Sequence, residues 1–205
     1  MKKHQPVLEQ LFKVVNSYLA QPPGYYQYLT EHLQPQFFAA NTVQYEKGDI
    51  VKKAWFLSSG FGIAYIYHDS GERQVVRIYT AGALIGGKSF IEQTPSEEYL
   101  MACRGSYWMS LTHAQVDEIY ILFPDVLEQS RLIMARREQE ELEHKKLLGL
   151  AAMEKIENFY KLYPALLEPG KILKDADIAS FLLLGKSTLR DIRAKLISEG
   201  KLKLP

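Results

Sequence analysis

The sequence predicts an α+β fold: an N-terminal antiparallel β-roll (a double-stranded β-helix or jelly roll), joined by a long helix to a C-terminal helix-turn-helix domain. Three observations lead to this prediction. Short alternating strands with glycine-containing turns fill the first half of the chain. A long charged helical stretch runs over residues 125–148. Two short helical segments joined by a tight turn follow over residues 175–196.

Length and composition limit the number of domains and the classes of protein that the chain can belong to. The 205 residues allow one medium domain or two small ones, and we predict boundaries at 1–123, 124–149 and 150–205. No stretch approaches the roughly 20 apolar residues of a membrane span, and the N-terminus lacks the features of a signal peptide. The single Cys103 precludes an internal disulfide and is typical of a reducing cytoplasm, where we expect the protein to be located.

Two helices are expected before the strands. Residues 6–20 place Leu8, Leu11, Phe12 and Val15 on one face. The Gln-Pro-Pro-Gly run at 21–24 ends this helix, and residues 25–33 form the second. Its three tyrosines are read as packing residues rather than as chemistry.

From Phe37 the pattern changes to short strands and turns. The turn at 47–49 and the hairpin connection at 69–72 separate apolar runs. The clearest strands are expected at 55–57, 63–67, 74–79, 99–103 and 108–111.

Helices resume at Thr112, which caps a helix with Gln115 as its capping-box partner. The long helix at 125–148 follows, with Gly149 as a soft joint before another helix at 150–162. The apolar face of the long helix fades by Arg137, so a solvated connecting helix stays an alternative to a dimer seam. After the helix-turn-helix, only a short strand at 201–204 is expected, too little for a two-stranded wing.

The two helices of the C-terminal motif meet at Gly185, which we expect at the N-cap of the second. Leu189, Ile192 and Leu196 form the apolar side of that second helix. Its polar face is basic, and residues 185–205 carry six Lys/Arg against two Asp/Glu, a local charge of +4 within a chain of net charge +1. A basic helix of this kind can enter a DNA major groove. An ordinary helical hairpin with a solvated face is the alternative.

The motif also resembles the DNA-binding end of the Crp/Fnr family of bacterial regulators. The residues that fall on the family's pattern without a gap are Ile178, Ala179, Ser180, Leu182, Thr188, Leu189, Ile192 and Arg193. The strand region is similar to the family's effector-binding β-roll through Tyr45, Lys47, Gly48, Asp49, Phe56, Ser59, Gly60, Gly71, Gly82 and Gly86. The resemblance covers residues 37–193 and implies a homodimer joined through the helix at 125–148.

The chain departs from the family pattern in the motif. Leu183 stands where a glycine usually opens the turn, and Gly185 where a serine usually caps the second helix. Arg190 and Asp191 replace the usual serine-arginine pair. Because a carboxylate repels phosphate, Asp191 puts the sequence preference in doubt rather than the fold.

The resemblance also bears on the ligand of the β-roll. In relatives that bind cyclic nucleotides, a glutamate holds the ribose and an arginine holds the phosphate; those positions here are Gly87 and Glu97. A carboxylate in place of the arginine replaces attraction by repulsion, so cyclic AMP is not expected to bind in the usual way. A weaker ligand-binding candidate is the loop of Gly86, Gly87, Lys88 and Ser89, with a plain structural turn as the alternative reading. An unknown small-molecule effector stays open.

Enzymatic activity is not expected. The five histidines are scattered singly, and the sequence has no nucleophile elbow, CxxC or HExxH motif. No catalytic residue, cofactor or metal site is predicted, and the single cysteine precludes a multi-cysteine iron–sulfur cluster.

The function expected is that of a DNA-binding transcriptional regulator with double-stranded DNA as its partner. Lys186 and Ser187 would face bases, Thr188 and Arg193 would face phosphates, and Arg190 would read a guanine. Two alternatives stay open: an interaction module that kept the fold but lost DNA binding, and a small-molecule receptor without a DNA role.

Overall fold

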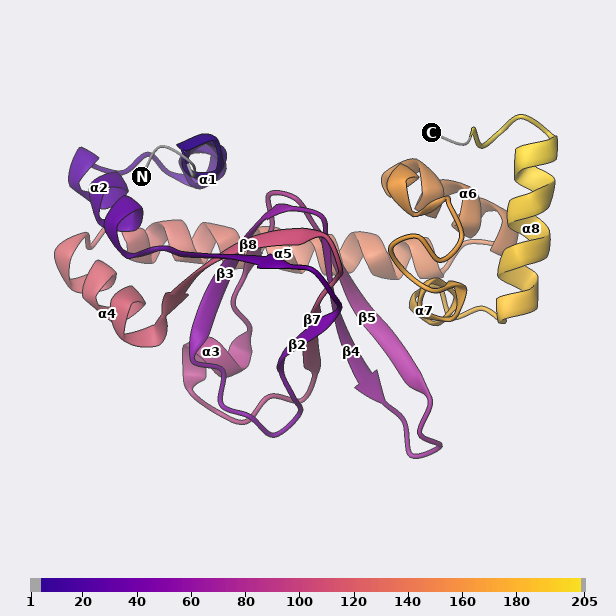
Figure 1. Cartoon of the computed structure of the whole chain (residues 1–205), viewed down its shortest axis with the longest axis horizontal. Helices are drawn as coiled ribbons and strands as arrows, with labels where there is room; N and C mark the ends of the chain where they lie inside the picture. Colours follow the sequence, from indigo (N-terminus) through magenta and orange to yellow (C-terminus); the bar gives the residue numbers. More distant parts are fainter. Residues whose placement is uncertain (1–4, 204–205) are drawn as a thin grey trace. The chain divides into compact units, whose positions relative to one another are not determined.

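The computed structural model describes residues 5–203 and divides into two compact units (Figure 1). The first unit contains the residues up to 64 together with 78–137. The second contains the hairpin segment 65–77 and the chain from 138 onward. The division into three domains expected from the sequence stays a prediction.

Two four-stranded sheets form the β-roll. The first has the strand order β1-β8-β3-β6, and its neighbouring strands pair antiparallel. The second has the order β2-β7-β4-β5. In chain order the strands are β1 Gln34–Phe38, β2 Thr42–Tyr45, β3 Lys53–Ser59, β4 Phe61–Tyr67, β5 Arg73–Thr80, β6 Leu84–Ile85, β7 Tyr99–Ala102 and β8 Ser106–Thr112.

Alternation along β3 and β8 gives the first sheet two buried faces. Phe56 and Met109 belong to a core formed with the N-terminal helices. Trp55 and Trp108 stack edge to face instead, with ring centroids 6.3 Å apart. The first sheet is therefore covered on both sides.

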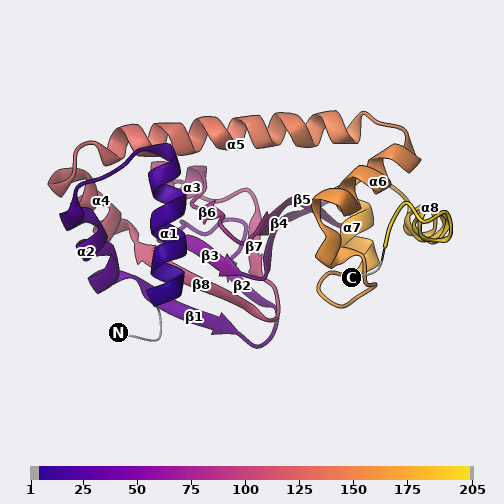
Figure 2. The ribbon, with the colours of Figure 1, turned by 90° about the horizontal axis from the view of Figure 1, so that it is seen from above.

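Helices cover the outer face of this sheet. They are α1 Gln5–Tyr18, α2 Pro23–His32, α4 His113–Leu122 and the first half of α5 Val126–Leu148. Figure 2 shows α1 lying across β3 and β8, and Leu11 and Val15 of α1 are buried in the shared core. The predicted capping box is present, because Thr112 and Gln115 exchange side-chain to backbone hydrogen bonds.

The second unit contains the C-terminal helices. After the second half of α5, the chain turns at Gly149 into α6 Ala152–Leu162 and a short 3₁₀ helix, Pro164–Leu166. The helix-turn-helix follows as α7 Asp175–Phe181 and α8 Lys186–Ser198. The predicted fold class is confirmed.

Local predictions differ from the structure in three places. Strand structure begins at Gln34 rather than Phe37, because β1 pairs with β8 along its whole length. The sequence did not predict strand β6 or the one-turn helix α3 Lys88–Glu92. The strand expected at 201–204 is wrong for its described part, since residues 201–202 form a bend and residue 203 has no regular structure, and Leu204 lies outside the described residues.

Candidate functional site

The interior of the β-roll is filled by aromatic rings. Trp108 packs edge to face against Phe38 at 5.7 Å between centroids, and Trp55 lies 6.0 Å from Tyr45. The Trp108 indole nitrogen donates to Ser106 Oγ at 2.9 Å. A Cβ added to Gly62 would lie 2.6 Å from Cζ2 of Trp108, so glycine makes room for the indole there. Rings thus fill space between the two sheets.

The predicted anion loop is arranged as a structural turn. Ser89 is buried; its hydroxyl accepts from the Val51 amide at 3.1 Å and donates to the Thr94 carbonyl at 2.5 Å. Lys88 is exposed and lies 3.7 Å from Glu92, one helical turn on. Gly87 is the N-cap of α3, which is only five residues long. These contacts support the structural alternative for Gly86–Ser89, and Glu97 lies exposed on the surface.

The turn of the helix-turn-helix closes with a Schellman motif. The Leu183 amide donates to the Ser180 carbonyl at 3.2 Å, and the Leu184 amide to the Ala179 carbonyl at 2.9 Å. This motif requires a left-handed residue, and Leu183 has φ +52°. The position therefore demands the conformation that glycine adopts freely, although the chain has leucine there. Gly185 is the N-cap of α8, as predicted.

Arg193 is buried inside the motif, so its expected role as a phosphate contact is wrong. Its guanidinium donates to both carboxylate oxygens of Asp175, at 2.8 and 3.0 Å, and to the Tyr160 hydroxyl at 3.0 Å. These hydrogen bonds hold the pKa of Asp175 below its ordinary value, although burial acts in the opposite direction. Arg193 therefore joins α8 to α6 and α7.

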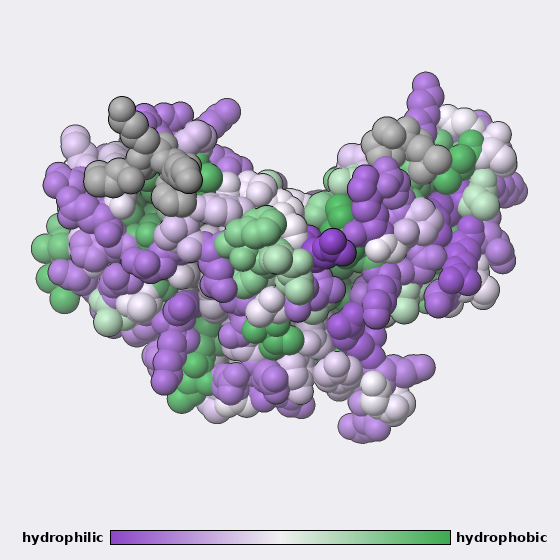
Figure 3. Space-filling model, in the orientation of Figure 1, coloured by the Kyte–Doolittle hydropathy of each residue, from purple (hydrophilic) through white to green (hydrophobic). Residues whose placement is uncertain are grey.

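The remaining predicted DNA contacts lie on the outer side of α8. Lys186, Ser187 and Arg190 are exposed, and Thr188 is half-buried. Lys186 has no ion-pair partner among residues 5–203, whereas Arg190 Nε donates to Asp175 at 3.1 Å. Figure 3 shows mostly hydrophilic side chains over α8. Asp191 is exposed among them, so it contributes negative charge to the same surface.

Comparison with known proteins identifies the β-roll. Residues 35–121 match the family model of the cyclic nucleotide-binding domain. This match covers most of the β-roll and less than half of the chain. A search of curated proteins finds no match.

Solved structures extend the likeness beyond the cyclic nucleotide-binding domain. FixK2 from Bradyrhizobium japonicum is 17% identical, with 82% of this chain and 86% of that chain covered at a TM-score of 0.68. The c-di-GMP responsive global regulator CLP of Xanthomonas campestris is 14% identical over 87% and 93% of the chains, with a TM-score of 0.64. The catabolite activator protein of Thermus thermophilus is 17% identical over 89% and 87%, with a TM-score of 0.53. The resemblance to Crp/Fnr regulators is thus confirmed at the level of the fold.

A hairpin of the cyclic nucleotide-binding domain contacts α7 within the second unit. Arg73 Nε donates to Asp177 Oδ1 at 3.0 Å, and Nη2 contacts the same oxygen. The Val75 amide of β5 donates to Ser180 Oγ at 3.1 Å. Arg73 also lies over the Tyr65 ring, 4.9 Å from its centroid. Sequence reasoning missed this contact, because it joins residues about a hundred positions apart.

Two further contacts hold the C-terminal end of α7. Lys155, buried on α6, donates to the Leu182 carbonyl at 3.2 Å, where an α-helix leaves its last carbonyls unpaired. His144 of α5 stacks on Phe181 with ring centroids 4.1 Å apart and lies 3.2 Å from the Phe181 carbonyl. Burial lowers the pKa of His144. The C-terminal end of α7 is therefore held from both α5 and α6.

Neither a metal centre nor a membrane span is found in the described part of the chain. Residues 5–203 place no group of three or more His, Cys, Asp or Glu side chains where they could hold a metal ion. None of their helices is long and apolar enough to cross a membrane.

Proposed function

We propose that this protein is a DNA-binding transcriptional regulator of Crp/Fnr type. The observation that carries the proposal is the helix-turn-helix, whose second helix α8 begins with the exposed Lys186 and Ser187. Helices of this kind contact base edges with their N-terminal residues. Such a regulator would act in the cytoplasm.

The solved structures give this proposal its functional context. CLP is described as a global regulator that links cell-cell signalling to virulence gene expression, and the Thermus protein as a catabolite activator. Their matches cover 87% and 89% of this chain. A regulatory role therefore fits the fold better than an enzymatic one.

In this proposal α8 binds DNA through fewer residues than the sequence alone suggests. Lys186 and Ser187 face bases, and Thr188 contacts a phosphate. Arg190 reaches a guanine only if it leaves Asp175, 3.1 Å away. Arg193 takes no part because it is buried.

The regulator would act as a homodimer through α5. Leu127, Met134 and Leu142 lie seven and eight residues apart on this helix and are 57%, 37% and 46% exposed. Apolar residues at such spacing face one side of a helix and suit a helix–helix seam. Operators of two half-sites would then match the dimer's two-fold axis.

Its effector would not be a cyclic nucleotide bound in the family's usual way. Gly87 and Glu97 stand where that binding needs a glutamate and an arginine, and aromatic rings fill space inside the roll. Isothermal titration with cyclic AMP and cyclic GMP should show no micromolar binding; a micromolar dissociation constant would contradict this part of the proposal.

Gel shifts on fragments of the source genome at low salt test the function itself. Wild-type protein should shift a subset of fragments, and Lys186→Ala should weaken those shifts. Lys161→Ala is the matched control, because Lys161 is an exposed lysine of α6 paired with Glu157. If no fragment shifts at low salt, the DNA-binding proposal fails, and the exposed Asp191 favours an interaction module.

A further inference from the structure

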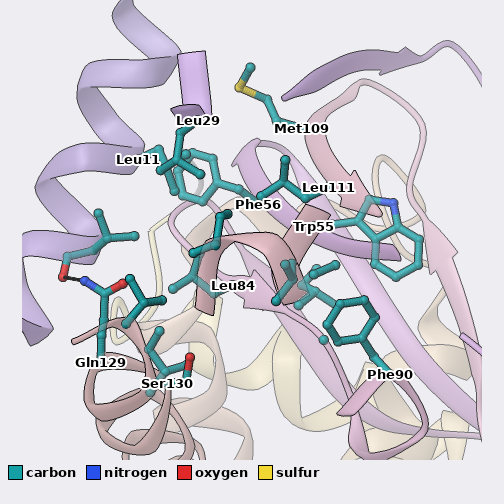
Figure 4. Close-up of a pocket in the computed structure, with 18 of the residues that line it drawn as sticks. Leu11, Leu29, Trp55, Phe56, Leu84, Phe90, Met109, Leu111, Gln129 and Ser130 are labelled. Atoms are coloured by element: carbon teal, nitrogen blue, oxygen red, sulfur yellow. Dashed lines mark hydrogen bonds between the residues drawn. The ribbon is translucent and has the colours of Figure 1, made fainter. Parts of the chain in front are cut away.

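A cavity of about 170 Å³ lies in the first unit, between the outer face of the first sheet and the helices α1, α2, α4 and α5 (Figure 4). Phe56, Leu84 and Met109 line it from the sheet, and Leu11 and Leu29 from the helices. Trp55 and Phe90 lie at one end, as Figure 4 shows. Most of this cavity is thus outside the β-roll, on the other side of the first sheet from the ring-filled interior.

The polar side chains inside the cavity already have protein partners. Gln129 donates to the carbonyls of Val15 at 3.1 Å and Leu19 at 2.8 Å, and accepts from the Tyr25 hydroxyl at 3.2 Å. The hydroxyls of Tyr120 and Ser130 lie 3.1 Å apart in a hydrogen bond. Because these groups are satisfied, the body of the cavity favours an apolar ligand.

Arg137 supplies the one cationic group of the lining. It is half-buried, and its Nη1 donates to the Gly86 carbonyl. A guanidinium has five N–H donors, and Arg137 has no carboxylate partner within residues 5–203. Ile91 beside it in the lining is itself exposed, so this end of the cavity opens to solvent. The cavity therefore combines an apolar body with donors for an anion at its mouth.

We propose that this cavity binds a small amphipathic carboxylate, with an apolar body of about one aromatic ring inside and the carboxylate on Arg137. The cavity volume suits one aromatic ring, because an engineered apolar cavity of about 150 Å³ holds benzene. A planar guanidinium binds a carboxylate with two parallel hydrogen bonds. This inference goes beyond the proposed function and does not depend on DNA binding.

Methyl-labelled methionine NMR on the full chain tests the location of binding. Met109 and Met134 line the cavity, whereas Met101 and Met153 do not. Titration with benzoate or phenylacetate should shift the Met109 and Met134 methyl signals in a saturable way and leave the other two in place. Absence of any saturable shift, or shifts confined to Met101 and Met153, would overturn the proposal.

Matched probes and variants test the chemistry. Benzyl alcohol lacks the charge and acetate lacks the apolar body, so each should bind at least tenfold more weakly than benzoate, a step of about 1.4 kcal/mol. Arg137→Gln should weaken benzoate by a similar factor. Arg131→Gln should not, because Arg131 is exposed on the same helix, pairs with Glu128 and lies outside the lining.

Ala54→Leu provides a variant that acts by volume rather than charge. Ala54 lines the cavity beside Gly86, so a larger side chain there occupies ligand space. Benzoate should bind this variant more weakly than it binds wild type, and an unchanged melting temperature would show that the variant keeps its fold. If Ala54→Leu does not fold, Arg137→Gln alone decides the matter. Benzoate binding of unchanged strength in Arg137→Gln would contradict the proposal.

Discussion

At the scale of single residues, Asp175 connects the parts of the helix-turn-helix. It lies in the first turn of α7, where a carboxylate also suits the helix dipole, and accepts hydrogen bonds from both Arg190 and Arg193. Its partner Arg193 is only 6% exposed. Removing one member of such a pair leaves the other charge buried without compensation.

Asp175→Asn should therefore destabilise the protein by about 3–5 kcal/mol at neutral pH. The pKa of Asp175 is lowered in the folded state, so its stabilisation is full above its unfolded pKa of about 3.9 and is lost as the pH falls through the folded value. Urea unfolding at neutral pH and near pH 3 measures both effects. The gap between wild type and Asp175→Asn should shrink at the lower pH; a gap that grows would contradict the pairing.

Leu183→Gly should stabilise the second unit, against the usual effect of placing glycine in a fold. A left-handed leucine costs about 1–2 kcal/mol, and glycine loses about 0.5–1 kcal/mol through its freer unfolded chain, so a net gain of about 0.5–1 kcal/mol is expected. The exposed Leu183 side chain gives up little packing. Leu183→Val is the control and should destabilise. Urea midpoints measure both, and a clear loss in Leu183→Gly would refute the strain.

At the scale of elements, the hairpin of β4 and β5 and helix α7 form one packed group. Besides the Arg73–Asp177 ion pair, the Val75 amide donates a hydrogen bond to the Ser180 hydroxyl on the next turn of α7. Asp177 is buried, so the ion pair is better shielded than a surface one. The β4–β5 hairpin thus contacts the first helix of the helix-turn-helix within the second unit.

Arg73→Gln should loosen α7 without unfolding the chain. Losing a charged hydrogen bond of this kind costs about 1–2 kcal/mol, which should speed amide exchange in α7 roughly 5- to 30-fold. Hydrogen exchange read by mass spectrometry measures this, with Arg131→Gln in the first unit as control. Unchanged exchange in α7 of Arg73→Gln would show that the hairpin does not hold the helix.

Whether the sequence predicts a feature depends on how far apart in the chain the residues that form it lie. Most strands, the capping box and the position of the turn depend on neighbouring residues and were predicted. The burial of Arg193 could also have been inferred from nearby residues. Arg193 lies four residues after Leu189 and three before Leu196, which places it on the same helix face as these two fully buried leucines. Its partner Asp175 and the hairpin contact of Arg73 depend on tertiary packing. Nor did the sequence indicate the cavity beside Arg137, which needs eight elements placed together, the strands β3, β6 and β8 and the helices α1–α5.

At the scale of the whole molecule, the central claim is that the first turn of α8 carries DNA binding. Exposed positive charge is sparse along α8: Lys186 has no ion-pair partner among the described residues, Arg190 pairs with Asp175, and Lys195 lies 3.9 Å from Glu199. Affinity should thus depend on few phosphate contacts and fall with salt less steeply than in strongly basic regulators.

The salt dependence of DNA affinity tests this claim most directly. Fluorescence anisotropy with a shifted fragment, at several salt concentrations, gives the slope of log K against log salt for wild type, Lys186→Ala and the control Lys161→Ala. Each lost phosphate contact flattens the slope by about 0.9, so a smaller slope is expected for Lys186→Ala if its charge neutralises a phosphate beside the base it faces. Lys161→Ala should match wild type. Identical slopes and affinities for all three proteins, or no binding by wild type at low salt, would contradict the account.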